Sequence, residues 1–443
     1  MRSLRRCLLL GAAGLAALAC PAVQAQSETA YEQLELRAQN RPLVSLSRAA
    51  EVSRGKPVQP GPPREVPNFR GQTGPNATGP DPDVQLAVVQ TAPGTENATL
   101  VGGMGFDGTD NLTNGQLLGF LIAPPDSDGH IGGASGQYFV QMINLLTTVF
   151  DRDGDVLLAP FASNAIWAGI GGNCEAYNQG DPIVLYDEQA DRWLFSQFAF
   201  PDSMSSFSQC VAISKTDDPR AGYNRYEFSF TGLGMNDYPK HGIVSDSITL
   251  MANLFTKRGS QFWYGGTWLA VLNKAAMYAG NTATMRGFNI GTGQFGFVAG
   301  DLDGPGSAEA LFGTAMSTAS TFDIWRITPN WGGSSASIGK LAGIPVTPFD
   351  RTLCSASRGA CIPQPDGAPA LESLSDRLMH RLQIRDFGSY RTMLAAHTVD
   401  VNGTGIAGIR WYEFRQPAAG SWSLSQEGTY APNDGQYRWM PSI

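Results

Sequence analysis

The chain has 443 residues, of which 52 are glycine and 16% are charged, and its formal net charge is −8. Low charge combined with abundant glycine and 10% aromatic residues is typical of a β-rich fold with many tight turns, because glycine adopts positive φ at no steric cost. The basic residues are scattered along the sequence rather than clustered, which argues against nucleic acid as a partner.

Residues 1–25 are predicted to be a secretory signal peptide. Arginines precede an apolar stretch from Leu8 to Leu18, and Ala25 provides a small residue for cleavage. That stretch is shorter than the ~20 residues a membrane-spanning helix needs, and we predict no membrane span elsewhere. We therefore expect a secreted or periplasmic protein. A lipoprotein anchored through Cys20 and a twin-arginine signal at Arg5-Arg6 remain open as alternatives.

Residues 26–70 are rich in Pro, Arg and Gln and poor in aromatic residues, which predicts a flexible N-terminal arm. Residues 71–443 are predicted to form a single domain, because short apolar runs alternate there with Gly, Asp, Asn and Pro, as strands alternate with turns. Within this domain, residues 91–136 are dense in Gly, Asp and Asn. We expect them to form an ordered loop inserted into the first structural repeat.

The segment Asp181–Thr216 holds three β-type runs, IVLYD, RWLFSQFAF and CVAISK, separated by turn residues. Looser versions of this meander recur along the chain. A four-stranded propeller blade has about the length of one such repeat. We therefore predict an all-β fold, a β-propeller-like array of four-stranded antiparallel blades with five to six repeats, whose ring need not be closed. The repeats open on similar turn signals, at Asp81-Pro82-Asp83, Asp181-Pro182, Asp237-Tyr238-Pro239, Asp301-Leu302-Asp303, Asp376-Arg377 and Arg438-Trp439.

Four cysteines lie beyond the signal peptide, and four cysteines allow three pairings. Cys354 and Cys361 are seven positions apart, a spacing that suits a disulfide closing a loop, and this leaves Cys174 to pair with Cys210. The spacing does not match a zinc knuckle. Two disulfides agree with export to an oxidising compartment.

One loop is a candidate calcium site. Asp301 and Asp303 are followed by Glu309 eight residues after Asp301, an arrangement similar to the calcium loops of integrin-type propeller repeats. Pro305 occupies the fifth position of the loop and cannot ligate through its side chain. The other interpretation is a Gly- and Pro-rich turn without metal. Calcium is the one cofactor that the sequence suggests.

Polar residues at the starts of the inner strands of a propeller gather at one opening of its central channel. The repeat alignment therefore predicts a group of ligand-binding side chains there, which suits a carbohydrate and, with a carboxylate pair, glycoside hydrolysis. In the alternative interpretation these side chains cap turns and pair across neighbouring blades. The predicted group consists of Asp83, Asp181, Asp237, Lys240, Arg377, Arg381 and Arg438, with His397 and Glu413 from strands of the fifth repeat.

Several motifs together resemble a poorly characterised family of large secreted bacterial proteins with a β-propeller-like, BNR/sialidase-like domain. They include DPDVQLAV, GDPIVLYDEQADRWLFSQF, DYPKHGIVSD, SDRLMHRLQIRDFG and QEGTYAPNDGQYRWMPSI, and they cover roughly residues 81–443. The resemblance implies a fold and no catalytic residue. It also implies that residues 91–136 are an addition and that the chain stops at Ile443 within a sixth repeat. A truncated chain, a ring with fewer blades, and self-association through an open blade edge all remain open.

Propellers bind ligands more often than they catalyse reactions. The leading hypothesis is therefore a recognition module that binds a carbohydrate or an extracellular protein at the channel mouth. One alternative is a glycoside hydrolase or polysaccharide lyase that uses Glu413 and His397. A second is a structural interaction protein that acts through an open blade edge.

Overall fold

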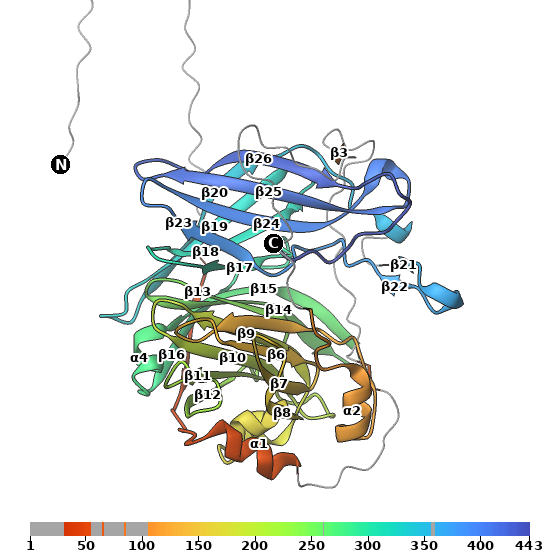
Figure 1. Ribbon diagram of the computed structural model, residues 1–443. Helices are drawn as coiled ribbons and strands as arrows, with labels where there is room; N and C mark the ends of the chain where they lie inside the picture. Colours follow the sequence, from red (N-terminus) through yellow and green to blue (C-terminus); the bar gives the residue numbers. More distant parts are fainter. Residues whose placement is uncertain (1–30, 55–63, 66–83, 86–104, 260, 356–358) are drawn as a thin grey trace, which may run out of the picture. The chain divides into compact units, whose positions relative to one another are not determined.

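The computed structural model describes residues 31–54, 64–65, 84–85, 105–259, 261–355 and 359–443 (Figure 1). The predicted signal peptide, Asp83 and residues 91–104 of the predicted insertion lie outside these ranges. In the described part of the chain, no helix is both long and apolar enough to cross a membrane.

The described residues form five four-stranded antiparallel meanders, which confirms the predicted propeller-like array of blades. Within each blade the strands are neighbours in sequence order, from the inner strand to the outer one. Blade 1 is β5 (Asp128–Gly132), β6 (Tyr138–Ile143), β7 (Leu146–Asp151) and β8 (Val156–Ala162), and blade 2 is β9 (Gly180–Asp187), β10 (Arg192–Ala199), β11 (Ser208–Ser214) and β12 (Tyr223–Ser229). Blade 3 is β13 (Met235–Ile243), β14 (Ser247–Arg258), β15 (Gln261–Asn273) and β16 (Ala283–Asn289). Blade 4 is β17 (Val298–Leu302), β18 (Ala310–Thr318), β19 (Thr321–Pro329) and β20 (Ala336–Pro345), and blade 5 is β23 (Leu382–Asp386), β24 (Tyr390–Asp400), β25 (Ala407–Pro417) and β26 (Ser423–Tyr430).

The five inner strands surround a common axis, because each is linked to the next. The Val184 amide of β9 donates to Asp128 of β5, and the Ile243 amide of β13 donates to Asp301 of β17. Strands β17 and β23 pair in parallel, and the amide of Tyr238 in β13 donates to Asp181 in β9. Among the described residues, a side-chain hydrogen bond from Arg381 to His130 completes the circle between blade 5 and blade 1.

The core lies between the blades, which explains why the strands of blade 2 are apolar on both faces. Alternate residues of β10 point to opposite sides: Leu194 and Phe198 pack in the cluster shared with blade 3, whereas Phe195 and Ala199 pack in the cluster shared with blade 1. A strand buried on both faces reads as a continuous apolar run, which is the pattern that made this segment prominent in the sequence.

Both predicted disulfides are present. Cys174 and Cys210 join a short helix to β11, with their Cα atoms 5.7 Å apart, and Cys354 and Cys361 close a loop of the predicted length. Disulfides of this kind persist in an extracellular or periplasmic compartment, where thiols are not kept reduced.

The prediction of a flexible arm over residues 26–70 is wrong for its described part. Strand β1 (Gln33–Ala38) pairs antiparallel with β16 at the edge of blade 3. Helix α1 (Leu46–Arg54) follows, and Leu46 and Ala50 on its inner face are fully buried. Composition missed this because β1 gains its stability from backbone pairing to a distant strand, which a polar, proline-rich sequence does not reveal.

Only part of the predicted insertion, residues 91–136, lies outside blade 1. Residues 105–127 decorate blade 1 with α2 (Asn111–Leu118) and β4 (Ile122–Ala123), but Asp128–Gly132 is the inner strand of that blade. The remaining elements are short. They are β2 (Arg64–Glu65), β3 (Val84–Gln85), β21 (Ala360–Ile362) and β22 (Leu371–Glu372), helices α3 (Gly172–Ala176) and α4 (Lys274–Tyr278), and 3-10 helices at Ser163–Trp167, Leu353–Ser355, Pro365–Gly367 and Val401–Gly403.

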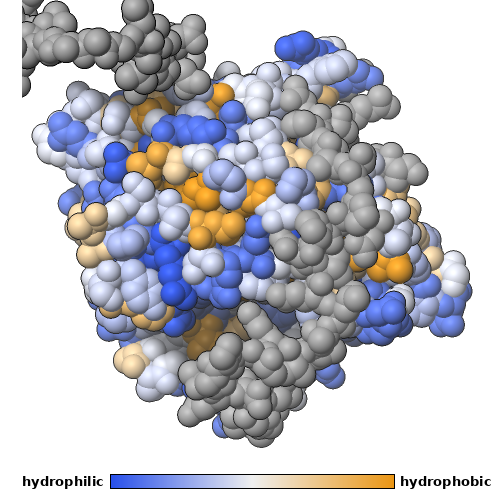
Figure 2. Space-filling model, turned by 90° about the horizontal axis from the view of Figure 1, so that it is seen from above, coloured by the Kyte–Doolittle hydropathy of each residue, from blue (hydrophilic) through white to orange (hydrophobic). Residues whose placement is uncertain are grey.

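Blade 5 packs against blade 4 through one face of its sheet. Phe322 of β19 contacts Tyr412 and Phe414 of β25, with ring centroids 5.7 and 4.4 Å apart. Figure 2 views the molecule from the side that carries β20, β25 and β26, at the top of Figure 1, and shows a patch of hydrophobic side chains near the middle of that face.

Candidate functional site

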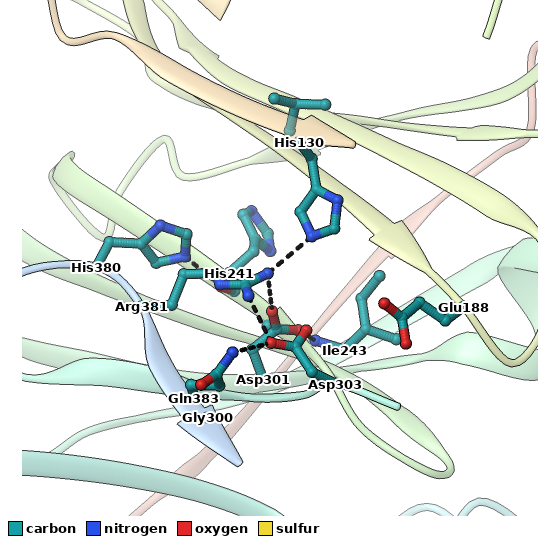
Figure 3. Close-up of polar contacts among 12 residues, drawn as sticks. His130, Glu188, His241, Ile243, Gly300, Asp301, Asp303, His380, Arg381 and Gln383 are labelled. Atoms are coloured by element: carbon teal, nitrogen blue, oxygen red, sulfur yellow. Dashed lines mark hydrogen bonds and ion pairs between the residues drawn. The ribbon is translucent and has the colours of Figure 1, made fainter. Parts of the chain in front are cut away.

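Charged side chains from several blades converge at the axis (Figure 3). The guanidinium of Arg381, which directly precedes β23, lies 3.1 Å from the Asp301 carboxylate and 2.5 Å from the Asp303 carboxylate. It also donates to His130 Nε2 at 2.8 Å. Gln383 donates a further hydrogen bond to Asp303. We call Arg381, His130, Asp301, Asp303 and Gln383 the axial cluster.

The hydrogen bonds of the axial cluster fix the protonation of His130. Because an arginine has only donors, His130 Nε2 must accept, and its Nδ1 therefore carries the proton and donates to the Ile131 carbonyl at 2.7 Å. Burial, and then the positive charge of Arg381, lower the pKa of His130 to about 4. The imidazole is thus neutral at physiological pH and acts as a hydrogen-bond acceptor on the axis.

The predicted calcium site is wrong, because an arginine occupies the place of a metal ion. Asp301 and Asp303 point toward Arg381, whereas Glu309 pairs with Arg326 at 2.9 Å. The described residues contain no group of three or more acidic, His or Cys side chains placed to bind a metal. Burial raises the pKa of Asp301 to about 7, with Arg381 opposing this shift and Asp303 adding to it.

A second group of polar side chains lies where the inner strands of blades 1, 2 and 3 begin. Asn144, in the turn after β6, links the Asp126 carboxylate to the backbone of Asp181. Its Nδ2 donates to Asp126 at 2.7 Å, and its Oδ1 accepts from the Asp181 amide at 3.0 Å. Asp181 Oδ2 in turn accepts from the Tyr238 amide at 3.1 Å. We call the group Asp126, Asp181, Asp237, Tyr238 and Lys240 the mouth.

The mouth carries backbone strain at two residues. Asp181 has φ +46° and Tyr238 has φ +55°, a left-handed conformation that costs about 1 kcal/mol or more for a residue other than glycine. Strained residues of this kind cluster at ligand-binding sites, where the surrounding structure holds them in place. The two strained residues are joined directly by the hydrogen bond between them.

The electrostatics of the mouth single out Asp181. Its side chain is buried, and burial raises its pKa well above the usual value. The neighbouring carboxylates of Asp126 and Asp237 raise it further, and Lys240 opposes the shift. Asp181 therefore binds a proton more firmly than an ordinary aspartate, beside other carboxyl groups.

The half-buried aromatic ring of Tyr238 lies at the mouth between two cationic side chains. The Lys240 ammonium lies 4.5 Å from the ring centroid and the Arg377 guanidinium lies 4.8 Å from it. The phenol donates to the Leu378 carbonyl at 3.0 Å, so the ring is fixed by contacts at its face and its hydroxyl. Arg377 is itself held by Asp376 at 2.8 Å and stacks over Phe295, 5.5 Å from the ring centroid.

Three residues of the predicted group lie elsewhere. His397 of β24 is fully buried and shares a hydrogen bond with the Tyr412 hydroxyl at 2.9 Å, inside the core of blade 5. Glu413 of β25 points to the other face of that blade, where it pairs with Arg415 at 2.5 Å. Arg438 pairs with Asp434 at 2.6 Å and lies over Tyr430 of the outer strand. The prediction failed because none of these residues belongs to an inner strand: His397 is in the second strand of blade 5, Glu413 is in the third, and Arg438 follows the outer strand.

Other predicted residues do meet at the axis. Asp181, Asp237 and Lys240 lie at the mouth, Arg377 contacts it through Tyr238, and Arg381 forms the centre of the axial cluster. Asp126, Asp128 and His130 of blade 1 were not predicted, because the repeat alignment places the start of the first repeat at Asp81. The signal that could have found them is the alternation of polar residues in DSDGH, directly before the strand-like run YFVQMI.

The sequence matches no family model and no curated protein. Solved structures with similarity to this chain include an endo-arabinase from Bacteroides thetaiotaomicron, 14% identical with a TM-score of 0.28, covering 57% of this chain and 81% of that one. A GH43_1 enzyme from Xanthomonas citri is 10% identical with a TM-score of 0.31, covering 71% of this chain and 93% of that one. A putative TolB from Agrobacterium tumefaciens is 13% identical with a TM-score of 0.29, covering 71% and 86%. No function follows from similarity at this level.

Proposed function

We propose that this protein is an exported recognition module that binds a carbohydrate at the mouth. The observation that supports this most directly is the meeting of acidic, basic and aromatic side chains from three blades around Asp181, two of them on strained backbone. Preorganised groups of this kind lose little conformational freedom when a ligand binds.

The chemistry of the mouth suits a polyhydroxylated ligand. Sugar hydroxyls donate to carboxylates and accept from cationic donors, and the mouth offers both, in Asp126 and Asp237 on one side and Lys240 on the other. A sugar ring also carries apolar C–H groups, and the aromatic ring of Tyr238 lies beside these polar groups. Charges of both signs side by side favour a neutral polyol over a polyanion or a polycation.

Retention on a panel of immobilised polysaccharides, followed by titration calorimetry with oligosaccharides, tests this proposal. Asp181→Asn is the informative variant, because asparagine tolerates positive φ better than other residues and keeps an oxygen to accept from the Tyr238 amide. Loss of the acidic group should weaken binding about tenfold, or ~1.4 kcal/mol. Asp246→Asn is the matched control, because Asp246 lies in the β13–β14 turn at the opposite end of blade 3. Equal affinity of Asp181→Asn and wild type, or retention on no sugar, would refute the proposal.

A second candidate function is glycoside hydrolysis, and the high proton affinity of Asp181 favours it. A carboxyl group with a raised pKa beside other carboxyl groups is the arrangement in which one acid protonates the leaving oxygen and another activates water. In this reaction Asp181 would be the general acid, and Asp126 or Asp237 the base. Release of reducing ends from the retained polysaccharide decides between the two functions. Hydrolysis that falls by ~100-fold or more in Asp181→Asn supports the enzyme, and retention without product excludes it for that sugar.

A further inference from the structure

The longest hairpin among the described residues projects from blade 3 at the end where the mouth lies. Strand β13 begins at Met235, which pairs with Phe255, and β16 ends at Asn289, which pairs with Trp268. Strands β14 and β15 continue past both neighbours, and Thr256 pairs with Trp263 beyond them. We call residues 255–259 and 261–266 the arm. Since Asp237 pairs with Asn253, Trp263 stands three residues, or roughly 10 Å, beyond the level of Asp237.

Contacts on its blade 2 side hold the arm rigid. Phe262 packs edge-on against Phe207 of the β10–β11 loop, with ring centroids 6.2 Å apart. Lys257 covers the Phe262 ring and reaches the Ser203 carbonyl of the same loop. At the base of the arm, the hydroxyls of Tyr264 and Thr267 share a hydrogen bond of 2.6 Å. These contacts fix the position of the arm before any ligand is present.

Trp263 differs from the other aromatic residues of the arm. Phe255, Phe262 and Tyr264 each contact another aromatic ring. Trp263 is half exposed and, among the described residues of the arm, is the one aromatic side chain without such a ring contact. Tryptophan is buried in most proteins and is enriched at the centres of binding surfaces. A rigid arm that leaves its largest apolar side chain in water is therefore suited to contact a ligand.

The base of the arm contacts the same loop as the mouth. Successive residues of a strand alternate sides. Phe262 and Tyr264 therefore lie on one side of β15, and Trp263 lies on the other side. The first side contacts blade 2 through Phe262. It also contacts the loop that leads into β17, where the ring centroids of Phe295 and Tyr264 are 5.3 Å apart. Trp263 is on the side that these contacts leave open. Arg377 stacks over both Phe295 and Tyr238. Aromatic groups thus continue from the mouth outward to the arm.

We propose that Trp263 is a second stacking platform, and that the site takes an extended oligosaccharide with one sugar unit at the mouth and a later unit on Trp263. This inference rests on the proposed function and adds to it the chain length of the ligand. The distance from Asp237 to the level of Trp263 exceeds the span of a single sugar ring, so a monosaccharide at the mouth does not reach the arm. Longer oligomers gain the contact, and affinity rises with chain length up to the point where Trp263 is covered.

The test is calorimetric titration of gluco-, manno-, galacto- and xylo-oligosaccharides, from monosaccharide upward, against wild type, Trp263→Ala and Phe387→Ala. Phe387 is the matched control: it is 54% exposed, compared with 50% for Trp263, and lies in the turn after β23, at the far end of blade 5 from the mouth. Trp263→Ala should lose at least tenfold in affinity for the longer oligomers and keep the affinity of wild type for the shortest ligand that binds. Phe387→Ala should match wild type throughout.

A second readout follows Trp263 itself. Subtracting the Trp263→Ala signal from that of wild type isolates the fluorescence of this side chain, and saturation with a long oligomer should protect it from acrylamide quenching. Wild-type binding that Trp263→Ala leaves unchanged at every chain length overturns the role of the arm and leaves the proposed function standing. Absence of binding by wild type to every oligosaccharide overturns both.

Discussion

Arg381 holds three blades together at the axis, and replacing it with methionine should reveal how much this contact stabilises the fold. At an effective dielectric of about 20, a unit charge pair about 3 Å apart is worth about 5 kcal/mol before desolvation is counted. Loss of one partner from a buried ion pair costs about 3–5 kcal/mol, because the remaining charges stay buried without a counter-ion. The Arg381 side chain is 19% exposed, which places the expected loss for Arg381→Met near the lower figure, at about 3 kcal/mol.

Urea unfolding at pH 8 and pH 5, followed by tryptophan fluorescence, measures this loss. Because burial raises the pKa of Asp301 to about 7, Asp301 is protonated at pH 5 and no longer needs Arg381, so the loss should be smaller there. Arg326→Met is the matched control. Arg326 pairs with Glu309 at 2.9 Å, but both side chains are 40% exposed, and an exposed pair contributes less than about 1 kcal/mol. An Arg381→Met variant as stable as Arg326→Met, or equally destabilised at both pH values, would refute the reasoning.

Three further predictions concern stability. The pKa of His130 is lowered to about 4, below the value of about 6.5 in an unfolded chain. The stability that the neutral imidazole contributes is therefore present above pH 6.5 and is lost as pH falls toward 4. In thermal melts at a series of pH values, His130→Gln should reduce this loss, and an unchanged profile would contradict the prediction. Removing the Cys174–Cys210 disulfide, which closes a loop of 36 residues, should cost about 4 kcal/mol in urea unfolding, and a loss under 1 kcal/mol would contradict the prediction. Gly242→Ala should cost about 3 kcal/mol, because its Cβ would lie 2.1 Å from the Gly300 carbonyl oxygen. Gly339→Ala is the control, because its Cβ would meet nothing within 4 Å. Equal thermal midpoints for the two variants would contradict the prediction.

Local patterns predicted the architecture better than the site. The apolar runs of blade 2 are visible because a strand buried on both faces keeps few polar residues, and the disulfide pairing followed from cysteine spacing alone. The site depended on which residue begins each inner strand. The alignment matched the start of the inner strand at Asp181 and Asp237. It was displaced in blade 4, where Asp301 lies near the end of β17, and in blade 1, where glycines within and after β5 hid the strand. His397 and Glu413 were assigned by residue type, and residue type does not distinguish an inner strand from a middle one.

The order of apolar runs, turn residues and cysteines by itself determined an all-β chain of repeated four-stranded units with two disulfides, because strand period and turn chemistry are local properties. Tertiary structure alone decided that Arg381, rather than a metal ion, lies between Asp301 and Asp303, and that Asp181 shares its surroundings with Asp126. Arg381 and Asp303 are 78 residues apart in sequence, and Asp181 and Asp126 are 55 residues apart. They meet because five inner strands surround one axis. Such contacts depend on how whole blades pack against one another, and this packing cannot be read from any one short segment of the sequence.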